Sequence, residues 1–142
     1  MKEKVQRVVG IAFIKDGKLL IVQSHRSKKT NSWTFVGGGV EEKETLIEAC
    51  IREVSEEIHN SFTIEASDLE LVMSFKESAA SDPHKMIEMS IYLCRKEINV
   101  PLTPNEEILE YHWYRFGEEG YNVSSSIKEH FAPYAVEKGI MY

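Results

Sequence analysis

The sequence predicts one α+β domain in which several strands pack with two helices. Its 142 residues suffice for one domain with its own core but not for two. Several short aliphatic and β-branched runs are bounded by turn residues, which is typical of strands, and two stretches carry apolar residues at helical spacing. Hydrophobic residues make up 42% and charged residues 28%, which excludes disordered, collagen-like and fibrous classes. Since no repeat or linker divides the chain, we expect one domain over residues 1–142.

Two aliphatic runs, residues 8–14 and 18–23, open the chain and predict a pair of antiparallel strands. Asp16 and Gly17 between them supply the positive φ angles of a tight hairpin turn. Residues 33–36 then predict a short strand that leads into three consecutive glycines, residues 37–39. Glycines at this point allow close backbone approaches that side chains would block.

Residues 44–58 predict an amphipathic helix. Its apolar residues fall within one arc of about 140°, and they are Leu46, Ile47, Cys50, Ile51, Val54 and Ile58. We expect this arc to face the core. Glu57 projects to the edge of the same arc.

The second half of the chain predicts four more strands and a final helix. The strands are expected at residues 62–64, 69–76, 86–94 and 109–116, with a connecting loop at residues 77–85. The tail, residues 124–138, has serines that can cap a helix, followed by apolar residues at helical spacing. Pro133 is expected to kink or divide this helix, and Gly139 to end it.

Charge and cysteine usage narrow the function class. The formal net charge of −6 argues against a partner such as duplex nucleic acid. Cys50 and Cys94 lie in apolar surroundings without metal-ligand or redox spacing, so we expect both in the core. No apolar stretch approaches the roughly 18 residues of a membrane span, and no signal peptide is recognisable. We therefore expect a cytoplasmic protein with no membrane partner.

Three glutamates on the predicted helix carry the chemistry. Glu53, Glu56 and Glu57 are related by i+3 and i+4 spacing, which places their carboxylates within about 100° of one another. Like charges side by side are destabilising, and Arg52 is the adjacent basic residue, so the group indicates either a bound cation or a solvated acidic face of the helix. Oxygen ligands select Mg²⁺ or Mn²⁺ over Zn²⁺, and Mg²⁺ commonly joins carboxylates to substrate phosphates. A carboxylate group beside a glycine-rich segment therefore indicates phosphate chemistry.

The segment from Gly38 to Glu57 closely resembles the signature of the Nudix hydrolases. That signature is a glycine, five residues, a glutamate, seven residues, Arg-Glu, an aliphatic residue, one residue, and Glu-Glu. The matching positions are Gly38, Glu44, Arg52, Glu53, Val54, Glu56 and Glu57. The upstream hairpin, Trp33 and the late strand containing Trp113 are similar to the family as well. His59 and Asn60 replace the terminal glycine and aliphatic residue, and we expect Asn60 to cap a helix one residue longer.

The resemblance implies a Nudix-like α/β/α sandwich with a mixed sheet. It implies a Mg²⁺-dependent hydrolase, with Mn²⁺ as the alternative metal, that cleaves a diphosphate (pyrophosphate) linkage in a nucleoside di- or triphosphate derivative. By resemblance, the metal ligands are the carboxylates of Glu53, Glu56 and Glu57 and the carbonyl of Gly37. Arg52 would orient a catalytic carboxylate, while Gly38 and Glu44 would support the loop and helix. One helix glutamate or a loop carboxylate would be the general base.

Several alternatives stay open at this point. The candidate loop carboxylates are Glu77, Asp82, Glu106 and Glu107. A small basic patch could meet substrate phosphates or simply be solvated, and it consists of His25, Arg26, Lys28 and Lys29. Aromatic side chains could stack on a base, although core positions are favoured, and these are Trp33, Phe35 and Phe75. Asn122 could read a base edge.

The substrate class and the assembly also stay open. ADP-ribose and dinucleoside polyphosphates are alternative small-molecule substrates. A non-catalytic nucleotide-binding sensor with the same fold is the rival from another class. A homodimer is compatible with the sequence.

Overall fold

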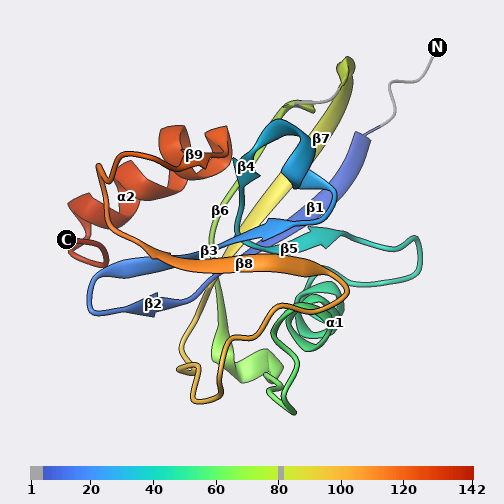
Figure 1. Cartoon of the computed structure of the whole chain (residues 1–142). Helices are drawn as coiled ribbons and strands as arrows, with labels where there is room; N and C mark the ends of the chain where they lie inside the picture. The colour runs from blue at the N-terminus through green and yellow to red at the C-terminus, as the bar shows by residue number, and fades with distance from the viewer. Residues whose placement is uncertain (1–4, 80–81) are drawn as a thin grey trace.

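Two helical layers enclose the strands in the computed structural model, which describes residues 5–79 and 82–142 (Figure 1). Helix α1 (Leu46–Ile58) covers one side of the strands. The other side is covered by a π-helical segment, η3 (Ser126–Phe131), which continues into α2 (Ala132–Glu137). This arrangement confirms the predicted α+β sandwich.

The larger sheet is mixed and has the strand order β5-β1-β7-β6. β1 pairs antiparallel with β5 and parallel with β7, while β6 and β7 form a long antiparallel hairpin. The bounds of these strands are β1 Val5–Ala12, β5 Val36–Gly39, β6 Leu69–Ala79 and β7 Asp82–Cys94.

A second, antiparallel sheet has the order β2-β3-β8, and a short parallel pair joins β4 to β9. These strands are β2 Ile14–Lys15, β3 Lys18–Ser24, β8 Ile108–Tyr114, β4 Ser32–Trp33 and β9 Asn122–Val123. Two 3₁₀ turns complete the described chain, η1 (Ser27–Thr30) and η2 (Ala66–Asp68).

Strand β3 explains why the core has two halves. Leu20 and Val22 pack in the cluster under α1, while Leu19 and Ile21 pack in the cluster under η3 and α2. Since successive side chains point to opposite faces of a strand, a strand buried on both faces needs a continuous apolar run. Burial between two helical layers therefore explains the unbroken aliphatic run of this strand.

The predicted N-terminal hairpin is only partly right. Its turn is confirmed, because Asp16 and Gly17 have φ angles of 51° and 74°. However, β3 pairs there with the two-residue β2, and β1 joins the larger sheet instead. The chain changes sheet around Phe13, whose side chain is buried in the core under α1. Most of the first predicted strand therefore pairs with strands that are distant in sequence.

Three other sequence predictions are wrong in detail. The glycines do not follow a strand but form most of β5 itself. Residues 62–64 are not a strand, and Phe62 and Ile64 are apolar because they fill the core. The expected loop at residues 77–85 is largely strand, since β6 and β7 extend until Ala79 pairs with Asp82.

Helix α1 is confirmed, although it begins at Leu46 and not at the predicted residue 44, and local chemistry sets both of its ends. It begins after Thr45, whose hydroxyl accepts the Glu48 N–H while the Glu48 carboxylate accepts the Thr45 N–H, a capping box. It ends at Ile58, so Asn60 does not cap a longer helix. Instead, His59, Asn60 and Ser61 all have positive φ, and the Asn60 side chain donates to the Pro101 carbonyl at 2.8 Å.

The tail and the cysteines behave as the sequence indicates. The division of the last helix is confirmed, because the π-helical segment passes into α2 next to Pro133, and Gly139 follows with a φ of 74°. Cys50 and Cys94 are buried free thiols. Within residues 5–79 and 82–142, no helix is long and apolar enough to cross a membrane.

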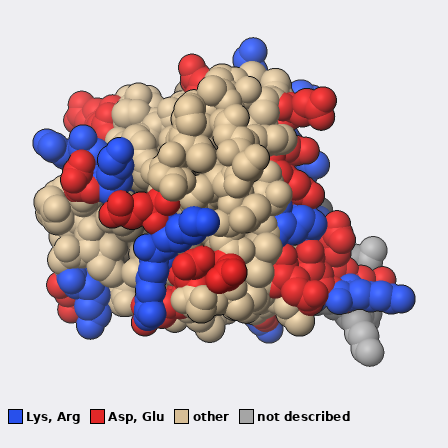
Figure 2. Space-filling model, turned by 90° about the horizontal axis from the view of Figure 1, so that it is seen from below, with Lys and Arg blue, Asp and Glu red and all other residues tan. Residues whose placement is uncertain are grey.

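Charged side chains of both signs share the surface. Figure 2 shows acidic and basic groups interspersed on the face seen from below, with acidic groups gathered on one side of it. Basic side chains are therefore present on this face even though the net charge of the chain is −6.

Candidate active site

Two of the three candidate metal-binding glutamates on α1 are buried. Glu53 and Glu57 lie four residues apart on α1, so their side chains leave the same face, and they are 9% and 6% exposed. Glu56 lies on the exposed edge, with 47% of its side chain accessible. The sequence placed Glu57 at the edge of the core-facing arc, and the structure buries Glu53 beside it.

The glycines of β5 make room for these carboxylates. The Gly37 N–H donates to both carboxylate oxygens of Glu57, at 3.2 and 3.4 Å. A Cβ atom on Gly38 would lie 2.7 Å from Oε1 of Glu53, and one on Gly37 would lie 2.0 Å from the Val9 carbonyl oxygen. Side chains at either position would therefore displace the helix carboxylate or the neighbouring strand.

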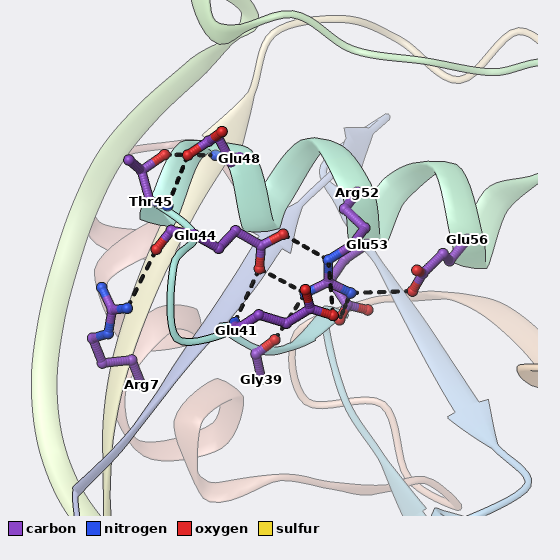
Figure 3. A network of polar contacts seen from close by, with 9 residues as sticks. All are labelled: Arg7, Gly39, Glu41, Glu44, Thr45, Glu48, Arg52, Glu53 and Glu56. Atoms are coloured by element: carbon purple, nitrogen blue, oxygen red, sulfur yellow. Dashed lines mark hydrogen bonds and ion pairs between the residues drawn. The ribbon is translucent and has the colours of Figure 1, made fainter.

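Arg52 connects the loop before α1 to the carboxylates (Figure 3). Its Nε and Nη2 donate to the two oxygens of Glu44 at 2.7 and 2.9 Å. Nη1 donates to Glu53 at 3.0 Å and to Glu56 at 3.2 Å, and Nη2 also reaches the Gly39 carbonyl at 3.0 Å. The bidentate contact with Arg52 lowers the pKa of Glu44 to about 2. One guanidinium thus sets the positions of three glutamates.

Glu57 has the opposite electrostatic character. Burial, together with the adjacent Glu53 carboxylate, raises the pKa of Glu57, while the Gly37 N–H partly opposes this shift. Glu107, on the loop before β8, raises it further. Two buried carboxylates side by side are costly unless a proton or a cation compensates one of them.

The three glutamates open onto a cavity of about 380 Å³. Basic side chains from the end of β3 and acidic ones from the loop before β8 also line it. The charged or titratable lining residues are His25, Arg26, Glu53, Glu56, Glu57, Glu106 and Glu107. A cavity that combines carboxylates with an arginine can hold a cation and a phosphate together.

The structure separates the remaining candidate residues from this cavity. Glu77 lies on β6 and lines a different cavity, and the Asp82 side chain lies outside the described residues. Lys28 and Lys29 are exposed on η1, and Asn122 donates to the Thr30 carbonyl, so none of these three lines the carboxylate cavity.

The aromatic candidates are mainly core residues. Trp33 and Phe35 are 6% and 3% exposed, which confirms the core positions favoured from the sequence. Phe75 is partly buried, and its ring stacks on His130 with centroids 3.8 Å apart.

Sequence reasoning missed Asn105 and Tyr111. Asn105 Nδ2 donates to the Glu57 backbone carbonyl at 3.1 Å and to the Tyr111 hydroxyl at 2.8 Å, and that hydroxyl donates to the same carbonyl. Asn105 Oδ1 accepts the N–H groups of Glu107 and Ile108. Asn105 therefore ties the loop that carries Glu106 and Glu107 to the end of α1. An asparagine three residues before a strand indicates such a turn from sequence, but not its contact with Glu57.

The carboxylates do not already form a closed metal cage. Across the described ranges, no three His, Cys, Asp or Glu side chains converge on one point as metal ligands. Arg52 engages Glu53 and Glu56, and the Gly37 N–H engages Glu57. The carboxylates of Glu53, Glu56 and Glu57 nevertheless offer oxygen donors to the cavity, and Mg²⁺ needs only one or two carboxylates when water and phosphate complete its shell.

Comparison with known proteins identifies the architecture. The model of the NUDIX domain family matches residues 4–132. The fold is similar to that of E. coli ORF135 protein (21% identity, 96% of this chain and 92% of that chain, TM-score 0.70). It is also similar to a MutT NUDIX hydrolase from Burkholderia pseudomallei (19%, 95% and 98%, 0.71) and to a UDP-X diphosphatase (20%, 98% and 66%, 0.74). A comparison with curated sequences found no significant match.

Proposed function

Because the chain belongs to the Nudix family of pyrophosphohydrolases, we propose that it is a Mg²⁺-dependent enzyme whose substrate is a nucleoside di- or triphosphate derivative. We also propose that its 142 residues make up one catalytic domain. The observation that carries the proposal is the buried pair of Glu53 and Glu57, which opens with Glu56 onto a cavity that Arg26 also lines.

The donor set fits a hard divalent cation. Glu53, Glu56 and Glu57 would hold it, with the Gly37 carbonyl as a further oxygen ligand. The crowded carboxylates and the raised pKa of Glu57 describe a site that a cation would stabilise. Mn²⁺ is the alternative because it prefers the same donors. When bound, the metal would neutralise phosphate oxygens and activate a water.

The chain's own residues then have distinct roles. Arg26 and His25, which line the same cavity and are exposed, would bind phosphate oxygens. Arg52 would hold Glu53 and Glu56 in position through the contacts at 3.0 and 3.2 Å.

The general base is the remaining role. Of the candidate loop carboxylates, Glu106 and Glu107 line the cavity, and we assign this role to Glu107 because its charge also acts on Glu57. As the oxygen of the attacking water bonds to one phosphorus atom, Glu107 would take a proton from that water. The bond between this phosphorus atom and the bridging oxygen would break, and the other phosphate group would leave with the bridging oxygen.

The main rivals are other diphosphate substrates. ADP-ribose and dinucleoside polyphosphates contain the same linkage, and the similarity to a UDP-X diphosphatase concerns the fold. A nucleotide-binding sensor needs no general base. The carboxylates of the candidate base and ligands all face one cavity, which favours turnover over sensing.

A hydrolysis panel tests the proposal. Purified protein would be incubated with nucleoside triphosphates, ADP-ribose and dinucleoside polyphosphates, with Mg²⁺ or with chelator, and phosphate and pyrophosphate would be measured. We expect turnover of at least one nucleoside triphosphate that disappears with chelator. Glu57→Gln should lower kcat by about 10²- to 10⁴-fold, while the exposed Glu42→Gln should not change it. Full activity of Glu57→Gln, or no turnover by folded, metal-loaded protein, would contradict the assignment.

A further inference from the structure

The turn that follows α1 has an unusual backbone. His59, Asn60 and Ser61 have φ angles of 58°, 55° and 64°, and none of them is a glycine. His59 also has a ψ of −158°, and this combination of angles is adopted almost only by glycine. Such conformations persist where contacts with the surrounding structure hold them. The contacts of this turn therefore show what fixes its shape.

Contacts on two sides hold the turn. The Phe62 N–H donates to the His59 carbonyl at 3.1 Å, and the Phe62 side chain is buried in the core. Nδ2 of Asn60 donates to the Pro101 carbonyl at 2.8 Å and to the Thr103 hydroxyl at 3.3 Å. The first contact returns the chain to the core. The contacts of Asn60 instead reach a segment that is about 40 residues further along the chain.

That segment belongs to the loop before β8, which carries the proposed general base. Glu107, at the C-terminal end of this loop, lines the cavity of the helix carboxylates. Asn105 holds the same end of the loop by donating to the Glu57 carbonyl at 3.1 Å, and the His25 N–H donates to the Glu107 carbonyl at 3.3 Å. The contacts of Asn60 hold the residues that come earlier in the loop. The loop is therefore attached at two places to the end of α1 and the turn that follows it.

Each of these attachments is weak by itself. Asn60, Pro101, Thr103 and Glu107 are exposed, so water competes for their hydrogen bonds. A loop held by several weak bonds keeps one position only while all of them are present, and a catalytic group displaced by about 1 Å can lose about 100-fold in rate. We propose that Asn60 is a positioning residue that acts through the loop before β8 and keeps Glu107 at the cavity of the helix carboxylates. This inference rests on the proposed function, in which Glu107 is the general base.

Two substitutions remove the donor but still allow the backbone of the turn. Asn60→Gly keeps positive φ accessible, and Asn60→Asp keeps the size of the side chain but replaces Nδ2 by an oxygen. With the nucleoside triphosphate that the unmodified protein hydrolyses fastest, we expect kcat to fall about fivefold and KM to stay within about twofold, because the phosphate-binding residues keep their places. His59→Gly is the matched control. The His59 side chain is exposed and glycine suits its backbone angles, so kcat should stay normal.

A double-mutant cycle shows whether Asn60 acts through Glu107. In a Glu107→Gln background, Asn60→Gly should lower kcat by less than about twofold, because the carboxylate that Asn60 positions is already absent. A merely structural effect would lower kcat about fivefold in both backgrounds, and that result would overturn the proposal. Normal kcat in both Asn60 variants, an equal loss in His59→Gly, or a rise in KM in place of the fall in kcat would overturn it as well.

Amide hydrogen exchange tests the attachment without turnover. The N–H groups of Glu107 and Ile108 donate to Asn105 Oδ1, so they report whether the loop is held. In Asn60→Gly their exchange should become about fivefold faster, while that of Val54 in the middle of α1 should not change. Faster exchange in a protein that hydrolyses nothing would support the attachment and refute the hydrolase. Hydrolysis by the unmodified protein, with exchange and kcat unchanged in Asn60→Gly, would do the reverse.

Discussion

Replacing Gly38 with alanine tests whether the Glu53 carboxylate must lie where the structure places it. The new Cβ would lie 2.7 Å from Oε1, 3.0 Å from Cδ and 3.1 Å from Oε2 of Glu53. Because ordinary contacts to carbon begin near about 3.5 Å, the carboxylate would have to withdraw by roughly 0.5 to 1 Å. A displacement of that size at a catalytic group costs about 100-fold in rate. We therefore expect kcat to fall about 100-fold.

The assay compares all three glycine variants. Gly39→Ala is the control, because its Cβ would meet Nε2 of Gln6 at 2.8 Å, and the exposed Gln6 side chain can swing aside. It should keep near-normal kcat. Gly37→Ala meets backbone at 2.0 Å and has a φ of 149°, so it should destabilise the fold itself by at least about 2 kcal/mol.

Steady-state kinetics with Mg²⁺ would be paired with thermal unfolding to separate the two effects. Gly38→Ala should lose rate without a comparable loss of Tm, whereas Gly37→Ala should lose both. The reasoning would be refuted if Gly38→Ala kept more than half of the normal kcat, or if Gly39→Ala lost as much as Gly38→Ala.

Further predictions concern the contacts of Asn105, the pKa of Glu57 and the packing of Ile58. Asn105→Ala removes the contacts between the loop and the Glu57 carbonyl, so kcat should fall about tenfold with little change in KM, and an unchanged kcat in initial-rate measurements would contradict the role given to that loop. The raised pKa of Glu57 means that the metal-free folded state binds more protons than the unfolded state above pH 4.5, so its stability should fall as the pH rises from 5 to 9. Mg²⁺ should then raise Tm more at pH 9 than at pH 6, because protons compete with the metal, and an equal shift in Tm at both pH values would count against metal binding by Glu57. Ile58→Ala truncates the fully buried side chain of the last residue of α1 and should lower the free energy of unfolding by about 2–5 kcal/mol in urea titrations, whereas a loss below about 1 kcal/mol would show that this end of the helix is loosely packed.

Features with local causes could be predicted from the sequence. The spacing of apolar residues predicted α1, and Asp16 and Gly17 form their turn from their own φ preferences. The spacing of Glu53 and Glu57 is a property of any helix. The resemblance to the family signature likewise depends only on the order of residues along the chain, so it places these carboxylates in register with the signature.

Features that depend on distant partners could not be predicted in this way. The sequence pattern paired residues 8–14 with residues 18–23, but β1 pairs with β5 and β7. An aliphatic run can form a strand in any sheet that is buried on both faces. Its composition therefore does not specify which strands pair with it.

The candidate loop carboxylates show the same division most clearly. In sequence, Glu77, Glu106 and Glu107 were equivalent candidates for one site. Glu106 and Glu107 line the cavity of the helix carboxylates, because Asn105 holds their loop against the end of α1. Glu77 lies on the extended strand β6 and lines a different cavity. The sequence by itself therefore determined the helix, its carboxylates and the family, because these follow from spacing along the chain. Only the tertiary structure decided which acidic groups share a cavity, because that depends on where strands and loops far apart in sequence meet.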